Sequence, residues 1–220
     1  MPNVRTIVIA ALVGTFPLLQ GCVPALLVTG AAVTVLSAHD RRSTGTQADD
    51  ETSEWKGGNR MPARYRHSTH VNFTAFNRVM LLTGEVPDDE ARQAIGAMAE
   101  KIEGIRKVHN ELVVGPLAAF SSRSNDAFVS SKFRTRLVES NQLSVNHIKA
   151  ITENGTLFLM GLVNEQEAKV AVAIARTTDG VRKVVNVLEI IPERETRQLD
   201  NTLLGAARTP PAETAPVEAR

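Results

Sequence analysis

β-rich runs of apolar residues predict two hairpins in this chain, and the second hairpin has the stronger signal. Residues 148–153 and 156–160 flank Asn154-Gly155. Both central residues of a type I′ turn need positive φ, which Asn and Gly adopt most easily, so a hairpin is expected here. The first copy keeps the alternation of apolar residues over 71–75, with the weaker turn signal Asn77-Arg78.

An amphipathic helix is expected after each hairpin. Asn164 and Glu167 have the spacing of a capping box, and apolar residues recur behind them at helical intervals. Each helix should end at a glycine, Gly104 or Gly180, because glycine adopts the left-handed conformation that stops a helix. Apolar strands over residues 108–114 and 184–191 should then return to the sheet through a crossover.

A further helix should precede each hairpin, but the two copies differ. In the second copy, residues 124–126 offer an N-cap, and every fourth residue from Val129 to Leu137 is apolar. In the first copy, residues 51–60 contain two adjacent glycines and few apolar positions. Two glycines cost about 2 kcal/mol relative to alanine, so this helix is expected to be short, frayed or absent.

An internal repeat relates these elements. Residues 104–110 read GIRKVHN, and residues 180–186 read GVRKVVN. We therefore predict an α+β fold of two tandem domains over residues 47–115 and 124–192, each ordered helix, strand, strand, helix, strand. Residues 193–220 contain several prolines and scattered charges without a packing pattern, so a disordered tail is expected there.

The start of the chain has the order of a secretory signal. Arg5 precedes an apolar run, and Gly21 stands directly before Cys22. This arrangement resembles a bacterial lipobox, in which the cysteine is acylated and becomes the first mature residue. We expect a lipoprotein signal peptide over residues 1–21, lipid attachment at Cys22, and a lipidated tether and linker over residues 22–46. Acyl chains contribute roughly 0.8 kcal/mol per buried CH₂ to membrane binding.

Two other interpretations of Cys22 are a buried core cysteine and a residue beside an uncleaved membrane anchor. The apolar run is shorter than the ~20 residues that a membrane span needs, and Pro17 interrupts it. Val23 follows Cys22 where an aspartate would mark inner-membrane retention in lipoproteins of enteric bacteria. By that analogy we expect a lipid anchor in the outer membrane, with the protein facing the periplasm.

Composition narrows the possible partners. The chain has 25 Lys and Arg against 24 Asp and Glu, and no basic block stands out, so nothing indicates a nucleic-acid partner. Cys22 is the only cysteine, which rules out an intramolecular disulfide. Aromatic residues make up 4%, so the core must rest mainly on aliphatic side chains.

Motifs for catalysis are missing from the sequence. No nucleophile and base can be paired by spacing, so we expect no enzyme activity, no catalytic residue, no cofactor and no small-molecule substrate. His67 and His70 could share a metal at their i, i+3 spacing. No cysteine or nearby carboxylate pattern completes such a site, so no metal is predicted.

The repeat, the order of its elements and the lipobox together resemble the dual BON-domain lipoproteins of Gram-negative bacteria. This group includes the division- and outer-membrane-stress-associated lipid-binding lipoproteins and, more distantly, an osmotically inducible periplasmic BON protein. The resemblance covers residues 18–191. Its most specific motifs are LLQGC at 18–22, RSTGTQ at 42–47, SND at 124–126, and TENG at 152–155 followed by FLMGLV at 158–163.

The resemblance implies an outer-membrane protein that binds anionic phospholipid through the first helix of its second domain and supports outer-membrane integrity. Phe128, Lys132 and Arg136 are spaced i, i+4, i+8 on that helix, with Arg134 elsewhere on it. An aromatic ring beside cations suits a membrane interface. The family carries a Trp where Phe128 stands, so the indole N–H is lost here.

Two alternatives to lipid binding remain open. The helix face could be an ordinary solvated surface, with Phe128 tucked between the domains. The protein could also be an adaptor, whose domains dock an envelope assembly factor or a regulator of cell-wall hydrolases while lipid serves only as the tether.

Overall fold

The computed structural model describes residues 40–208, which belong to one compact unit spanning residues 37–220. Cys22, the predicted signal peptide and most of the predicted tether lie outside the described residues, and so does the segment 209–220. Between residues 40 and 208, no helix combines the length and the apolar character needed to cross a membrane.

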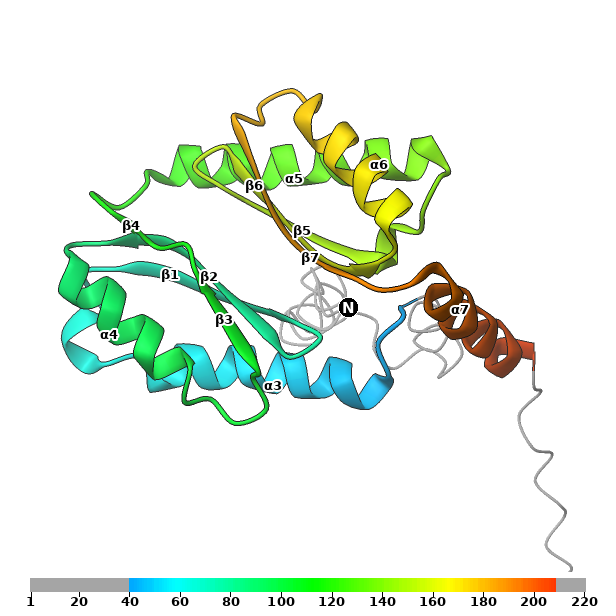
Figure 1. Cartoon of the computed structure of the whole chain (residues 1–220). Coiled ribbons are helices and arrows are strands. Elements are labelled where there is room, and N and C mark those ends of the chain that lie inside the picture. Colours follow the sequence, from blue (N-terminus) through cyan, green and yellow to red (C-terminus); the bar gives the residue numbers. More distant parts are fainter. Residues whose placement is uncertain (1–39, 209–220) are drawn as a thin grey trace, which may run out of the picture. The chain divides into compact units, whose positions relative to one another are not determined.

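The described chain repeats one order of elements (Figure 1). The first copy consists of α3 (Thr44–Arg60), η2 (Ala63–Tyr65), β1 (His70–Phe76), β2 (Val79–Val86), α4 (Asp89–Ala99), β3 (Lys107–Asn110) and β4 (Val113–Val114). The second copy consists of α5 (Phe120–Ser140), η3 (Val145–His147), β5 (Ile148–Glu153), β6 (Thr156–Val163), α6 (Glu165–Arg176) and β7 (Lys183–Ile190), and α7 (Glu193–Arg208) follows it. The predicted α+β class and the order helix, strand, strand, helix, strand are confirmed.

Each copy forms a sheet whose central strand is the second strand of the hairpin. In the first sheet, β1 pairs antiparallel with β2, and β3 and β4 pair parallel with β2. In the second sheet, β5 pairs antiparallel with β6, and β7 pairs parallel with β6. The closing strand therefore returns beside the hairpin in both copies, as the sequence predicted.

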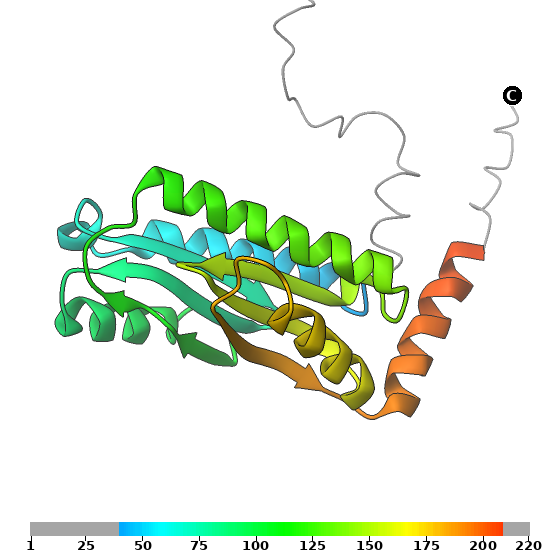
Figure 2. The same ribbon diagram turned by 90° about the horizontal axis from the view of Figure 1, so that it is seen from above.

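Each sheet packs against helices on one face and against the other sheet on the opposite face (Figures 1 and 2). On the helix side, Leu82 of β2 and Ile95 of α4 belong to one buried cluster, and Leu159 of β6 and Phe133 of α5 belong to another. Alternate residues of a strand point to opposite faces of the sheet. The residues that point away from the helices form a third cluster between the two sheets. Its buried members are Phe76, Leu81, Phe158, Met160 and Leu162.

Both hairpin turns have the predicted left-handed backbone. Asn77 and Arg78 have φ values of 49° and 64°, and Asn154 and Gly155 have values of 50° and 67°. These values are typical of a type I′ turn.

A buried aspartate on the first helix of each copy holds the hairpin turn. Asp50 accepts hydrogen bonds of 2.7 and 2.8 Å from the two turn N–H groups of the first hairpin. Asp126 accepts bonds of 2.8 and 2.9 Å from the two turn N–H groups of the second. The same contact in both copies shows that it belongs to the architecture of the repeat.

The expected N-cap of α5 at residues 124–126 is wrong. The helix begins at Phe120, and its N-cap residue, Ala119, makes no side-chain capping bond. Asp126 could not cap the helix because its side chain binds the hairpin turn. The predicted apolar stripe from Val129 to Leu137 is buried, as expected.

The expectation that the first helix is short, frayed or absent is also wrong, because α3 spans 17 residues. Ser43 caps it by accepting a hydrogen bond from the N–H of Thr46. Gly57 lies against β1, where an added Cβ would come within 2.5 Å of Phe73 Cδ1. This glycine therefore permits close packing, and tertiary contacts outweigh its low helix propensity.

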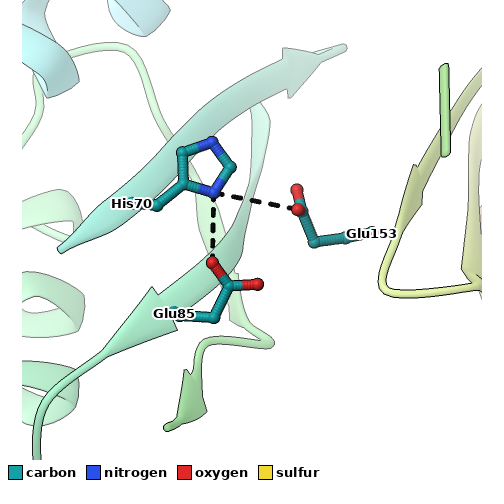
Figure 3. Close-up of side chains that lie close together, drawn as sticks. All are labelled: His70, Glu85 and Glu153. Carbon is teal, nitrogen blue, oxygen red and sulfur yellow. Dashed lines mark hydrogen bonds and ion pairs between the residues drawn. The ribbon is translucent and has the colours of Figure 1, made fainter. Parts of the chain in front are cut away.

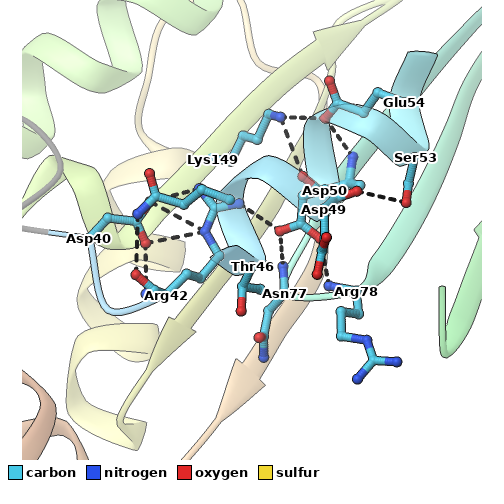
Figure 4. Close-up of polar contacts among 12 residues, drawn as sticks. Asp40, Arg42, Thr46, Asp49, Asp50, Ser53, Glu54, Asn77, Arg78 and Lys149 are labelled. Atoms are coloured by element: carbon cyan, nitrogen blue, oxygen red, sulfur yellow. Dashed lines mark hydrogen bonds and ion pairs between the residues drawn. The ribbon is translucent and has the colours of Figure 1, made fainter. Parts of the chain in front are cut away.

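Polar contacts fix the start of α3 (Figure 4). Arg42 forms ion pairs of 2.7 Å with Asp40 and 2.8 Å with Asp50. Farther along the helix, Glu54 accepts a 2.6 Å bond from Lys149 of the second copy. Residues 40–42, which the sequence assigned to the linker, are thus part of the folded structure.

The prediction of a disordered tail is wrong for residues 193–208, which form α7. Arg41 is buried, and its guanidinium donates to Asp200 of α7 at 2.8 Å and to Glu167 of α6 at 2.7 Å. Leu199 also packs against the cluster between the sheets. These partners are remote in sequence, so the composition of the tail alone could not reveal them.

The second helix of each copy stops a few residues before its predicted glycine. α4 ends at Ala99 and α6 ends at Arg176. Gly104 and Gly180 lie in the turns that follow, with φ values of 94° and 93°. The glycines therefore allow the turn into the closing strand. At the other end of α6, the capping box of Asn164 is present as predicted.

Candidate functional site

The outer face of α5 carries three exposed large apolar side chains. Phe120, Phe128 and Val138 are 78%, 60% and 59% exposed, while the inner stripe of the helix is fully buried. Such side chains contribute nothing to the packed core. Phe128 is not tucked between the domains, and the helix presents apolar surface to solvent.

Cations lie beside both exposed rings. The Lys132 ammonium is 4.8 Å from the centre of the Phe128 ring, and the Arg123 guanidinium is 6.0 Å from that of Phe120. Lys132 also forms a 2.5 Å ion pair with the exposed Asp179, and this bond lowers the pKa of the Asp179 carboxyl. The face thus combines aromatic rings with positive charge, and Lys132 is partly neutralised.

The two predicted arginines have different environments. Arg136 donates to the carbonyl of Ile174 at 3.1 Å and to the hydroxyls of Thr177 and Thr178 at 2.9 and 3.0 Å. It therefore holds the end of α6. Arg134 is exposed and makes one long bond of 3.5 Å to a backbone carbonyl. Of the two, Arg134 is the cation that is free to bind an external anion.

The structure therefore brings Phe128 and Lys132 together, leaves Arg134 exposed, and engages Arg136 within the domain. The sequence missed Phe120 and Arg123, because the helix was expected to start after them. Phe120 and Arg123 are spaced i, i+3, which resembles the i, i+4 spacing of Phe128 and Lys132. This pairing of an aromatic residue with a cation is the sequence signal by which they could have been predicted.

A second group of side chains lies where the two sheets meet (Figure 3). His70 and Glu85 are directly opposite each other on β1 and β2, and Glu153 is the last residue of β5. His70 Nδ1 is 3.2 Å from Glu85 Oε2 and 3.8 Å from Glu153 Oε1. The sequence missed this cluster because its carboxylates are distant from His70 along the chain.

Burial dominates the electrostatics of this cluster. The side chains of Glu85 and Glu153 are only 3% and 10% exposed. Burial raises the pKa of Glu153, and the nearby charges of Glu85 and Asp126 act in the same direction. A hydrogen bond from Asn72 and the proximity of His70 oppose this shift.

Two copies of one small α+β unit, with exposed aromatic and cationic groups on the first helix of the second copy, define a protein of two tandem, repeated domains. The chain belongs to the BON domain family, which matches residues 56–116 and 125–192.

Named relatives extend the similarity beyond the two domains. The chain is 36% identical over 185 residues to the outer membrane lipoprotein DolP of Haemophilus influenzae, covering 83% of this chain and 95% of the relative. It is 30% identical over 154 residues to a 21 kDa hemolysin of Actinobacillus pleuropneumoniae, covering 69% and 79%. It is 26% identical over 125 residues to the osmotically inducible protein Y of Escherichia coli, covering 56% and 62%.

Proposed function

We propose that this protein is a non-enzymatic outer-membrane lipoprotein that faces the periplasm and supports the integrity of the outer membrane. In this proposal Cys22 carries the lipid anchor, and the second BON domain binds anionic phospholipid through α5. The observation that carries the proposal is the exposed face of α5, with a cation beside each of its two exposed rings. The similarity to an outer membrane lipoprotein over most of the chain supports the location.

The residues on this face suit the boundary between acyl chains and headgroups. Phe120 and Phe128 supply rings for the acyl boundary, and Arg123 and Arg134 supply charge for phosphate. Each Lys or Arg near an anionic membrane surface contributes about 1 kcal/mol to the free energy of membrane binding. Such a contact is weak alone, but a lipid at Cys22 makes it intramolecular, so a modest affinity suffices.

Vesicle binding by a chain without its acyl anchor tests this proposal. The chain from Val23 onward is expected to sediment with vesicles of phosphatidylcholine and phosphatidylglycerol, and not with vesicles of phosphatidylcholine alone. Phe128→Ala and Arg134→Glu should each weaken this binding. Lys169→Glu, an equal charge reversal at an exposed position of α6, serves as the control and should bind normally.

If the chain from Val23 onward, without substitutions, fails to bind anionic vesicles, the proposed role of α5 in lipid binding is overturned. Equal weakening by the Lys169 control would show that net charge alone controls binding, and would overturn it as well.

One observation favours an adaptor as the second candidate function. Trp55 of α3 is 71% exposed in the first domain, and exposed Trp residues are frequent anchors of protein interfaces. An adaptor predicts that Trp55→Ala abolishes capture of an envelope protein by the immobilised chain, while vesicle binding is unchanged. Capture that persists in this variant would remove Trp55 from the candidate interface.

A further inference from the structure

In the group formed by His70, Glu85 and Glu153, two buried carboxylates share one possible counter-charge, the imidazole of His70. Within residues 40–208, the only ion pairs of the two glutamates are those with His70. Buried carboxylates are costly without a counter-charge, so this place favours a cation.

The three side chains offer one ligand atom each at spacings that suit a small metal ion. Their candidate atoms all lie within 4.8 Å of one another. Zn²⁺ binds nitrogen at about 2.0–2.1 Å and carboxylate oxygen at about 2.0–2.2 Å, which places a nitrogen and an oxygen ligand of a tetrahedral ion about 3.3–3.5 Å apart. The separations of 3.2 and 3.8 Å from His70 Nδ1 lie on either side of that value.

Neighbouring amides orient both carboxylates. Asn72 Nδ2 donates to Glu153 Oε2 at 2.8 Å, and Asn154 Nδ2 donates to Glu85 Oε1 at 3.1 Å. The other oxygen of each carboxylate faces His70, and Glu85 Oε2 also accepts a 3.2 Å bond from a backbone N–H. The two amide bonds reach the carboxylate oxygens that face away from His70. Hydrogen bonds of this kind hold the ligands of a metal site in place.

A neighbouring hydroxyl gives a separate indication. Thr83 stands opposite Asn72 in the register of the hairpin and two residues before Glu85, so all three share one face of the sheet. Its Oγ1 is buried and has no hydrogen-bond partner among the described residues. Buried polar groups are normally satisfied, and a water molecule carried by a metal ion would satisfy this one.

We propose that His70, Glu85 and Glu153 bind one divalent transition-metal ion, for which Zn²⁺ is the best match. Three protein ligands leave the fourth position of a tetrahedral ion for water. Mg²⁺ and Ca²⁺ fit poorly, because they prefer more oxygen ligands and no imidazole. Since two ligands come from the first domain and one from the second, the ion joins the domains.

Metal binding by the full-length chain, purified in detergent and stripped with a chelator, tests the proposal. Titration calorimetry with ZnCl₂ is expected to give about one Zn²⁺ per chain, and Zn²⁺ should raise the unfolding temperature because it binds only the folded state. His70→Gln and Glu153→Gln should each weaken binding by more than about tenfold, a loss typical of an altered metal site. Glu153→Gln keeps an oxygen that can accept the Asn72 bond.

His67→Gln is the matched control, because this exposed histidine lies three residues from His70 and outside the cluster. Its affinity should equal that of the unmodified chain. Binding that is unchanged in both ligand variants, or lost in the control, would overturn the proposal. If a ligand variant fails to fold, measurements on the chain without substitutions still test the proposal. Binding of well below one Zn²⁺ per chain, or an equal rise of the unfolding temperature with CaCl₂, would also overturn the proposal.

Discussion

A single carboxylate in each domain, Asp50 or Asp126, connects the first helix to the hairpin turn. Both residues are buried, and each accepts two backbone hydrogen bonds. A charged acceptor makes these bonds stronger than bonds between neutral groups. The two carboxylates thus help to set how each first helix lies on its sheet.

Asp126→Ala is expected to lower the free energy of unfolding by about 3 kcal/mol, because the part-buried N–H of Asn154 and the buried N–H of Gly155 lose their acceptor. Urea denaturation measures the change. Asp179→Ala is the control, since it removes a carboxylate whose side chain is 90% exposed, and it should change the stability little. Similar losses in the two variants would contradict the role of Asp126.

The sequence revealed those features whose signals are local. Asn154-Gly155 identified the hairpin, and the capping box of Asn164 identified the start of α6. It did not reveal the use of Asp126, because an aspartate near a helix start also suits an N-cap. It could not reveal the pairing of Arg41 with Asp200 or the approach of Glu153 to His70, since folding alone brings these residues together.

Among the elements, α3 shows how neighbouring residues of one helix can have opposite constraints. Gly57 faces β1, where an added Cβ would overlap the ring of Phe73. Gly58 has no atom within 4 Å of such a Cβ. Glycine lowers helix stability at both positions, but only at Gly57 does close packing require it.

Gly58→Ala is expected to raise the free energy of unfolding by about 0.5–1 kcal/mol, because alanine favours the helix and lowers the entropy of the unfolded chain. Gly57→Ala should lower it by more than about 1 kcal/mol, because the added methyl group overpacks the contact with β1. Thermal unfolding measures both. The two variants share one helix and one substitution, so equal shifts would contradict the packing role of Gly57.

At the scale of the whole described chain, a buried ionic network joins the segment before α3 to α6 and α7. Arg41 binds both Glu167 and Asp200, and His147 Nε2 lies 3.7 Å from Asp200. Burial and then the charge of Arg41 lower the pKa of His147, and they outweigh the opposing carboxylates of Asp200, Glu167 and Asp40. Burial alone would raise the pKa values of Glu167 and Asp200, but hydrogen bonds and charge from Arg41 lower both.

The protein is therefore expected to lose stability as the pH falls below about 6.5, the ordinary pKa of histidine. Between that value and the lower pKa of folded His147, the unfolded state binds more protons, so acid favours unfolding. Glu167 and Asp200 act in the same direction at more acidic pH, as it falls below their ordinary pKa values of 4.5 and 3.8 toward the lowered values of the folded state. Unfolding temperatures measured from neutral to acidic pH check this expectation.

His147→Gln should flatten the first part of this loss, just below the ordinary pKa of histidine, whereas the exposed His67→Gln should leave it unchanged. An unaltered pH profile in His147→Gln would assign the loss to other groups.

Each sheet uses the same face for its contact with the other sheet. Leu81 is the third residue of β2, Phe158 is the third residue of β6, and both lie in the cluster between the sheets. Equivalent surfaces meet in this way in a symmetric homodimer. The chain places this contact between equivalent faces within one molecule, so the pairing does not depend on protein concentration. A single copy alone would expose the apolar face that the two sheets bury against each other here.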